Sequence, residues 1–62
     1  MNAQTKKMIR DWLQMHNGDV EGLARWMRDS ANIGGIKACR ALIEEYQALE
    51  YAQRQYEREL AA

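Results

Sequence analysis

The sequence contains no proline and no phenylalanine, and it has only one cysteine, one histidine and four glycines among its 62 residues. A lone cysteine cannot form an internal disulfide, and with a lone histidine it falls short of the four ligands of a structural zinc site. No apolar run approaches the roughly 18 residues of a membrane span, and the N-terminal segment lacks the apolar region of a signal peptide. We therefore expect a cytoplasmic protein with no cofactor, no metal and no contact with a membrane.

The composition is that of a small helical domain. Apolar residues make up 47% of the chain, and nine basic residues balance nine acidic ones. A disordered chain has fewer apolar residues and a higher net charge. The absence of proline and the abundance of Ala, Leu, Met, Glu, Gln and Arg predict helix almost throughout. A chain of this length buries only about 60% of its unfolded surface and usually needs disulfides, a metal or a second copy for stability. Because the first two are excluded, we expect residues 1–62 to form a single domain that oligomerises.

Two breaks divide the chain into three predicted helices. Asn17 and Gly18 tolerate the left-handed conformation that ends a helix, and Asp19 is a good N-cap for the next one. The glycines Gly34 and Gly35 end the second helix. The predicted helices cover residues 3–16, 20–30 and 36–60. The fold class is therefore all-α, with two short helices packed on a long C-terminal helix.

The long helix carries apolar residues at the heptad spacing of a left-handed coiled coil. Its first half has a broad apolar face, widened by Ile36 and Ile43, as expected of a helix that packs against two others. Its second half keeps only a narrow stripe, flanked by Glu50, Glu57 and Glu59, which suits one partner helix. The predicted dimer seam consists of Leu42, Tyr46, Leu49, Gln53, Tyr56 and Leu60.

Three arrangements could cover this seam. A second copy of the chain is the prediction we favour. The alternatives are helix 3–16 folding back along the whole long helix and, after it, a helix of a different protein. The flanking glutamates repel one another in a parallel pair, whereas antiparallel pairing or a basic partner could bring them near arginines. The sequence leaves the orientation of the pair open.

The segment from Gly18 to Met27 resembles the start of a helix-turn-helix of the Fis type, with Gly-Asp before a helix that carries a small Ala24 against the turn. The resemblance covers about 20 residues and implies DNA binding by residues 19–40, through Arg28, Lys37 and Arg40. Arg28 stands where that pattern has the turn glycine, and the loop to Ile36 is long. DNA binding is therefore the alternative function.

Catalysis is not predicted. Cys39 and His16 are the only possible nucleophile and base. Cys39 falls on the apolar stripe of the long helix, and His16 falls at a helix end, where an imidazolium would interact favourably with the helix dipole.

Candidate partner-binding residues are Arg25, Trp26, Arg28 and Tyr51, which join large aromatic side chains with a charged rim. We expect a homodimeric adaptor or stoichiometric inhibitor of a larger protein, of a size common among proteins of phages and mobile elements.

Overall fold

The computed structural model describes residues 1–61, and these form an all-α fold of two short helices packed on a long one. Helix α1 spans Ala3–Met15, and α2 spans Val20–Trp26 and continues into a π-helical turn, η1, at Met27–Ala31. Helix α3 spans Ile36–Ala61 and sets the long dimension of the molecule, which measures 43 × 21 × 18 Å. The predicted fold class is confirmed.

The break between α1 and α2 has the predicted geometry. Asn17 and Gly18 adopt φ angles of 58° and 78°, so both are in the left-handed region that closes a helix. The side chain of Asp19 then accepts a hydrogen bond of 3.0 Å from the backbone N–H of Gly22, which satisfies one of the free donors at the start of α2. Local backbone chemistry therefore places the turn that reverses the chain here.

The second helix differs from the prediction in its last turn. The sequence predicted a regular helix over 20–30, but residues 27–31 form a π-helical turn, and Asn32 ends it with a φ of 51°. Met27 is fully buried at the start of this turn, whereas the preceding Trp26 keeps 38% of its surface exposed. Trp26, a candidate partner-binding residue, is therefore accessible at the edge of the core.

The core is small and lies on the first half of α3. Its buried side chains come from every helix and share an apolar or weakly polar character. They are Ile9, Leu23, Ala24, Met27, Cys39, Ile43 and Tyr46. Trp12 is half-buried against it. The broad apolar face predicted for the first half of the long helix is confirmed, because Ile43 is buried and Ile36 packs against the core. Cys39, expected on the apolar stripe of the same helix, is buried as well.

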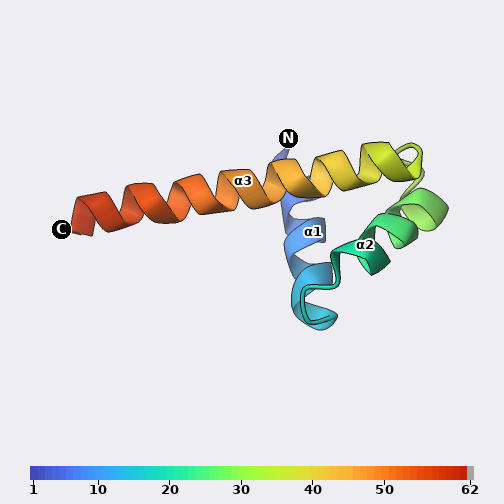
Figure 1. Cartoon of the computed structure of the whole chain (residues 1–62), viewed down its shortest axis with the longest axis horizontal. Coiled ribbons are helices and arrows are strands. Elements are labelled where there is room, and N and C mark those ends of the chain that lie inside the picture. The colour runs from blue at the N-terminus through green and yellow to red at the C-terminus, as the bar shows by residue number, and fades with distance from the viewer. Residues whose placement is uncertain (62) are drawn as a thin grey trace.

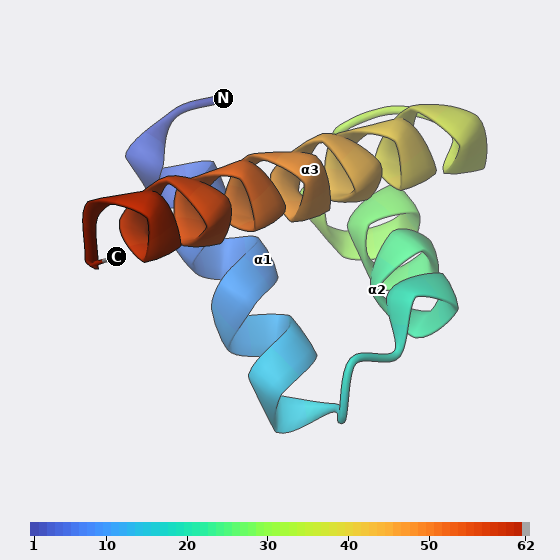
Figure 2. The same ribbon diagram turned by 60° about the vertical axis from the view of Figure 1, so that its left-hand side comes forward.

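The second half of α3 projects beyond the core (Figures 1 and 2). Helix α2 packs against the first part of α3, and α1 crosses α3 near its middle instead of running along it. Of residues 51–61 only Gln55 is half-buried, and the others are exposed. Helix α1 therefore leaves the second half of α3 uncovered. The arrangement in which the first helix folds back along the whole long helix is not the one observed.

Candidate association surface

The main candidate surface is the exposed part of the predicted seam, which we call the distal seam and define as Leu49, Gln53, Tyr56 and Leu60. These residues follow one another at spacings of four, three and four, so they lie on one face of α3. Leu49, Tyr56 and Leu60 are 43%, 59% and 69% exposed. Three large apolar side chains in a row on one helix face form the kind of patch that marks an interaction site.

The other two predicted seam residues lie inside this chain's own fold. Leu42 is half-buried and packs against the core, and Tyr46 is 7% exposed. The heptad pattern is continuous along α3, but the tertiary structure divides it. Its first part packs within the chain, and its second part, the distal seam, faces solvent.

A hollow of about 170 Å³ joins the distal seam to α1. It is lined by Lys6, Tyr46, Leu49, Glu50 and Gln53, and we call it the seam hollow. The Tyr46 hydroxyl donates a hydrogen bond of 2.9 Å to Glu50 Oε1. Burial and this bond to a carboxylate together raise the pKa of the Tyr46 hydroxyl above its ordinary value. The N-terminal part of α1 thus places a lysine over the end of the distal seam.

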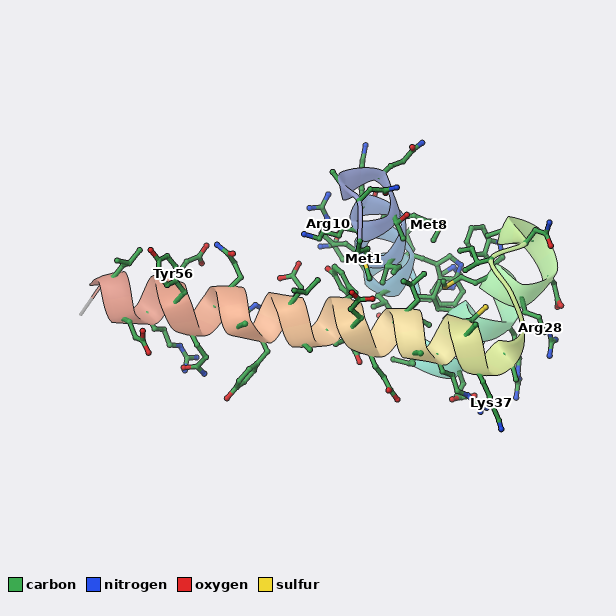
Figure 3. The ribbon with its side chains drawn as sticks, turned by 90° about the horizontal axis from the view of Figure 1, so that it is seen from above. Met1, Met8, Arg10, Arg28, Lys37 and Tyr56 are labelled. Atoms are coloured by element: carbon green, nitrogen blue, oxygen red, sulfur yellow. The ribbon has the colours of Figure 1, made fainter. Side chains whose placement is uncertain are left out.

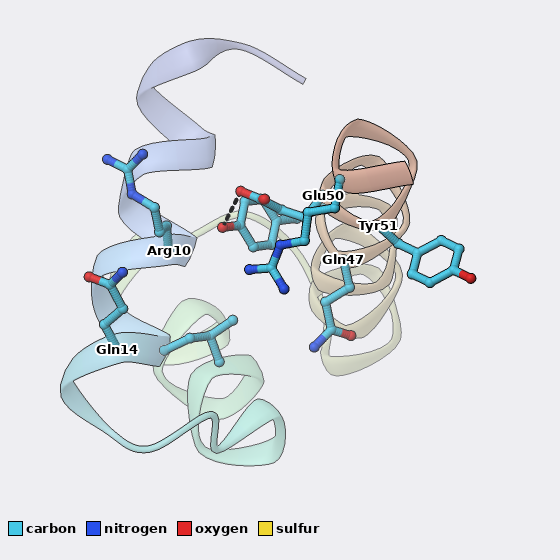
Figure 4. Close-up of a pocket in the computed structure, with 8 residues that line it drawn as sticks. Arg10, Gln14, Gln47, Glu50 and Tyr51 are labelled. Atoms are coloured by element: carbon cyan, nitrogen blue, oxygen red, sulfur yellow. Dashed lines mark hydrogen bonds between the residues drawn. The ribbon is translucent and has the colours of Figure 1, made fainter. Parts of the chain in front are cut away.

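A larger cleft of about 550 Å³ lies between α1 and α3 (Figure 4). Arg10 and Gln14 face it from α1, Gln47 and Glu50 face it from α3, and the ring of Tyr51 points away from α1 (Figure 4). At about 100° per residue, Gln47 and Tyr51 lie on the opposite side of α3 from the distal seam. Sequence reasoning missed this cleft because it depends on where α1 crosses α3.

The predicted partner-binding residues do not form one surface. Arg25, Trp26 and Arg28 belong to α2 and η1, and Arg28 lies at the loop end of the molecule (Figure 3). Tyr51 is 67% exposed and lines the α1–α3 cleft, near the middle of α3. A partner that used all four residues would have to reach around the molecule, so they constitute two separate candidate contacts.

Two of the three cations predicted to contact DNA are paired with carboxylates. Arg40 makes a two-pronged contact with Glu21, with Nε–Oε1 and Nη2–Oε2 distances of 3.0 and 2.8 Å. This contact lowers the pKa of Glu21 and raises that of Arg40. Arg28 binds Asp29 through Nε at 2.8 Å. Of the three cations, Lys37 alone has no carboxylate partner among residues 1–61, and it points away from the body near Arg28 (Figure 3).

The Glu21–Arg40 pair differs from what helical spacing alone favours. Glu21 and Arg25 stand four residues apart along α2, but the salt bridge of Glu21 joins α2 to α3 instead. Arg25 and Asp29 have the same spacing, yet the salt bridge of Asp29 is with its neighbour Arg28. Short pairs along a helix give way here to contacts that the packing of α2 on α3 makes available.

Cys39 and His16 have separate structural settings. The thiol of Cys39 is buried in the core, 3.6 Å from the carbonyl oxygen of Gly34. The His16 ring stacks on Trp12 at the end of α1, with ring centroids 3.8 Å apart. Within residues 1–61, no group of three or more His, Cys, Asp or Glu side chains could hold a metal ion, and no helix is long and apolar enough to cross a membrane.

Comparisons of this chain with protein-family models, with curated proteins and with solved structures give no match.

Proposed function

We propose that this chain is a small protein-binding module that pairs with a second copy of itself through the distal seam. The observation that carries the proposal is the row of exposed apolar side chains on the part of α3 that projects beyond the core (Figure 1). Each of these side chains would gain burial in a coiled-coil-like pair, at roughly 25 cal/mol for every Å² removed from water.

The small core gives a second reason for pairing. Among residues 1–61 seven are buried and form the core, and no disulfide is available because Cys39 is the only cysteine in the sequence. Domains of this size commonly gain stability from a second copy. A pair built on the distal seam would extend the apolar core along the half of α3 that has none.

Pairing through the distal seam leaves two surfaces for a larger target protein. One is the α1–α3 cleft, with Tyr51 at its edge, and the other is the exposed face of α2 and η1 around Trp26. Large aromatic side chains with arginines beside them are typical of binding hot spots. An adaptor or a stoichiometric inhibitor needs such surfaces and no catalytic group, so we propose that role for the pair.

Light scattering on the purified chain tests the proposal. We expect the full chain to have twice the monomer mass of 7.2 kDa, and Leu49→Glu/Tyr56→Glu to have the monomer mass with unchanged helix content by circular dichroism. Tyr51→Glu is the control, because Tyr51 is more exposed than Leu49 or Tyr56 but faces away from the distal seam, and this variant should remain a dimer. A monomeric full chain at the highest concentration tested would overturn the proposal.

A further inference from the structure

We infer that the two copies pair antiparallel, with Leu60 of each copy against Leu49 of the other, at the seam hollow and beneath Lys6. This inference rests on the self-association proposed above and adds the orientation, the register and a charged contact. The second copy is the occupant because its own seam and its own acidic edge complement what the hollow presents.

The burial pattern favours the antiparallel arrangement. A parallel pair in register would set Leu42 against Leu42 and Tyr46 against Tyr46, but both side chains are already packed within their own chain. An antiparallel pair uses only the exposed half of each α3. The distal seam, which an antiparallel pair needs, is exposed. Leu42 and Tyr46, which a parallel pair would also use, are already covered.

The spacing of the distal seam specifies a register. If Leu60 of one copy lies beside Leu49 of the other, Tyr56 lies beside Gln53, and the two-fold axis repeats both contacts. The overlap covers 11 residue steps of α3, or about 16 Å of helix. Every member of the distal seam then has a seam residue opposite it, and Gln53 faces the hydroxyl-bearing Tyr56 instead of an aliphatic side chain.

The acidic edge of α3 explains why a lysine is needed at this place. Glu50 and Glu57 are seven residues apart, so they border the same side of the distal seam. In the antiparallel register, Glu57 of the second copy comes level with Ala52, within a turn of Glu50. At that separation the carboxylates of Glu50 and of Glu57 from the second copy repel each other. This repulsion would oppose pairing unless a cation lies between them.

Lys6 is the cation that the fold supplies there. It lines the seam hollow together with Glu50, Leu49 and Gln53, and it takes part in none of the three salt bridges formed by residues 1–61. Because α1 crosses α3 at this point, Lys6 lines the same hollow as Glu50. From there its ammonium would contact Glu57 of the second copy. The tip of the second copy's α3 thereby reaches the α1 helix of the first.

Disulfide crosslinking of the dimer reads the orientation. In an antiparallel pair, Leu49→Cys chains mixed with Leu60→Cys chains should form a mixed disulfide, and neither variant should crosslink to itself. The reason is that like positions lie about 16 Å apart, whereas a disulfide needs Cα atoms within about 7 Å. Crosslinking of each variant to itself with no mixed product would show a parallel pair and overturn the inference, while the self-association would stand.

A charge exchange at Lys6 tests the contact independently of cysteine variants. Lys6→Glu should weaken the dimer by about tenfold in Kd at low salt and by less at high salt, whereas Lys7→Glu, the control on the same helix, should change Kd by less than about twofold. Glu57→Lys should restore pairing of the Lys6→Glu chain, and Glu45→Lys should not. Rescue by Glu45→Lys instead of Glu57→Lys would indicate a parallel pair, because Glu45 borders the other edge of the seam.

These outcomes separate the two proposals. A wild-type chain of monomer mass overturns self-association, and the inference fails with it. A wild-type dimer that crosslinks like to like, or that is indifferent to Lys6→Glu, overturns only the inference.

Discussion

Replacing Ile43 by alanine should remove a large part of this protein's folding free energy, whereas the same truncation at Leu60 should leave the fold almost unchanged. Ile43 is fully buried where α3 meets the other helices, and Leu60 is 69% exposed near the end of the projecting half of α3. The two substitutions remove aliphatic groups of the same size from one helix. Their contrast therefore measures how the core is distributed along α3.

The expected magnitudes follow from burial. Truncating a buried isoleucine to alanine costs about 2–5 kcal/mol, because burial is lost and a cavity remains. A domain of 62 residues has a total stability of about 3–9 kcal/mol, at roughly 0.05–0.15 kcal/mol per residue. With the middle of both ranges, Ile43→Ala should remove about half of the stability. In a single chain, Leu60→Ala loses only the smaller buried fraction of its side chain, which is worth about 1 kcal/mol or less.

Urea denaturation followed by far-ultraviolet circular dichroism measures both losses. The measurement belongs in the Leu49→Glu/Tyr56→Glu chain, which we expect to be monomeric, so that association does not add to the folding free energy. Equal losses for Ile43→Ala and Leu60→Ala would refute the reasoning, because they would mean that the end of α3 is packed within the chain. A loss below about 1 kcal/mol for Ile43→Ala would place the core elsewhere.

Two further predictions concern the turn and the buried tyrosine. Alanine in place of a helical glycine normally stabilises a protein by about 0.5–1 kcal/mol. A methyl group at Gly22 would instead collide with the carboxylate of Asp19 that caps α2, so Gly22→Ala should lower the urea midpoint. The loss of stability should be smaller when Asp19 is replaced by alanine as well. An additive pair of losses would contradict this clash. Because its pKa is raised, the Tyr46 hydroxyl binds its proton more tightly in the folded chain, so its contribution to stability is complete below about pH 10 and is lost as the pH rises through the folded-state pKa. Unfolding free energies measured across that range should fall less steeply for Tyr46→Phe, and identical slopes would exclude the mechanism.

Much of the fold could be predicted from the sequence because it depends on local rules. The left-handed Asn17 and Gly18, the Asp19 cap and the glycine break before α3 act within a few residues, so the helix boundaries follow from them. Helical periodicity likewise predicted the side of the long helix that packs against the other two. The π-helical turn at Met27–Ala31 was not predicted, and no residue in that segment signals it.

The candidate surfaces were only partly predictable. The sequence by itself determined three helices, their apolar faces and a heptad stripe along α3, because side-chain spacing on a helix depends on nothing beyond the helix. The tertiary structure alone decided where α1 crosses α3. That crossing buries Tyr46, leaves Leu49, Tyr56 and Leu60 exposed, and brings Lys6 to the seam hollow beside Glu50. It also opens the α1–α3 cleft. The packing of α2 on α3 brings Arg40 to Glu21, whose spacing along α2 alone would favour a pair with Arg25. Contacts between helices depend on their angle and register, which arise from the packing of all the faces together and from no single stretch of the chain.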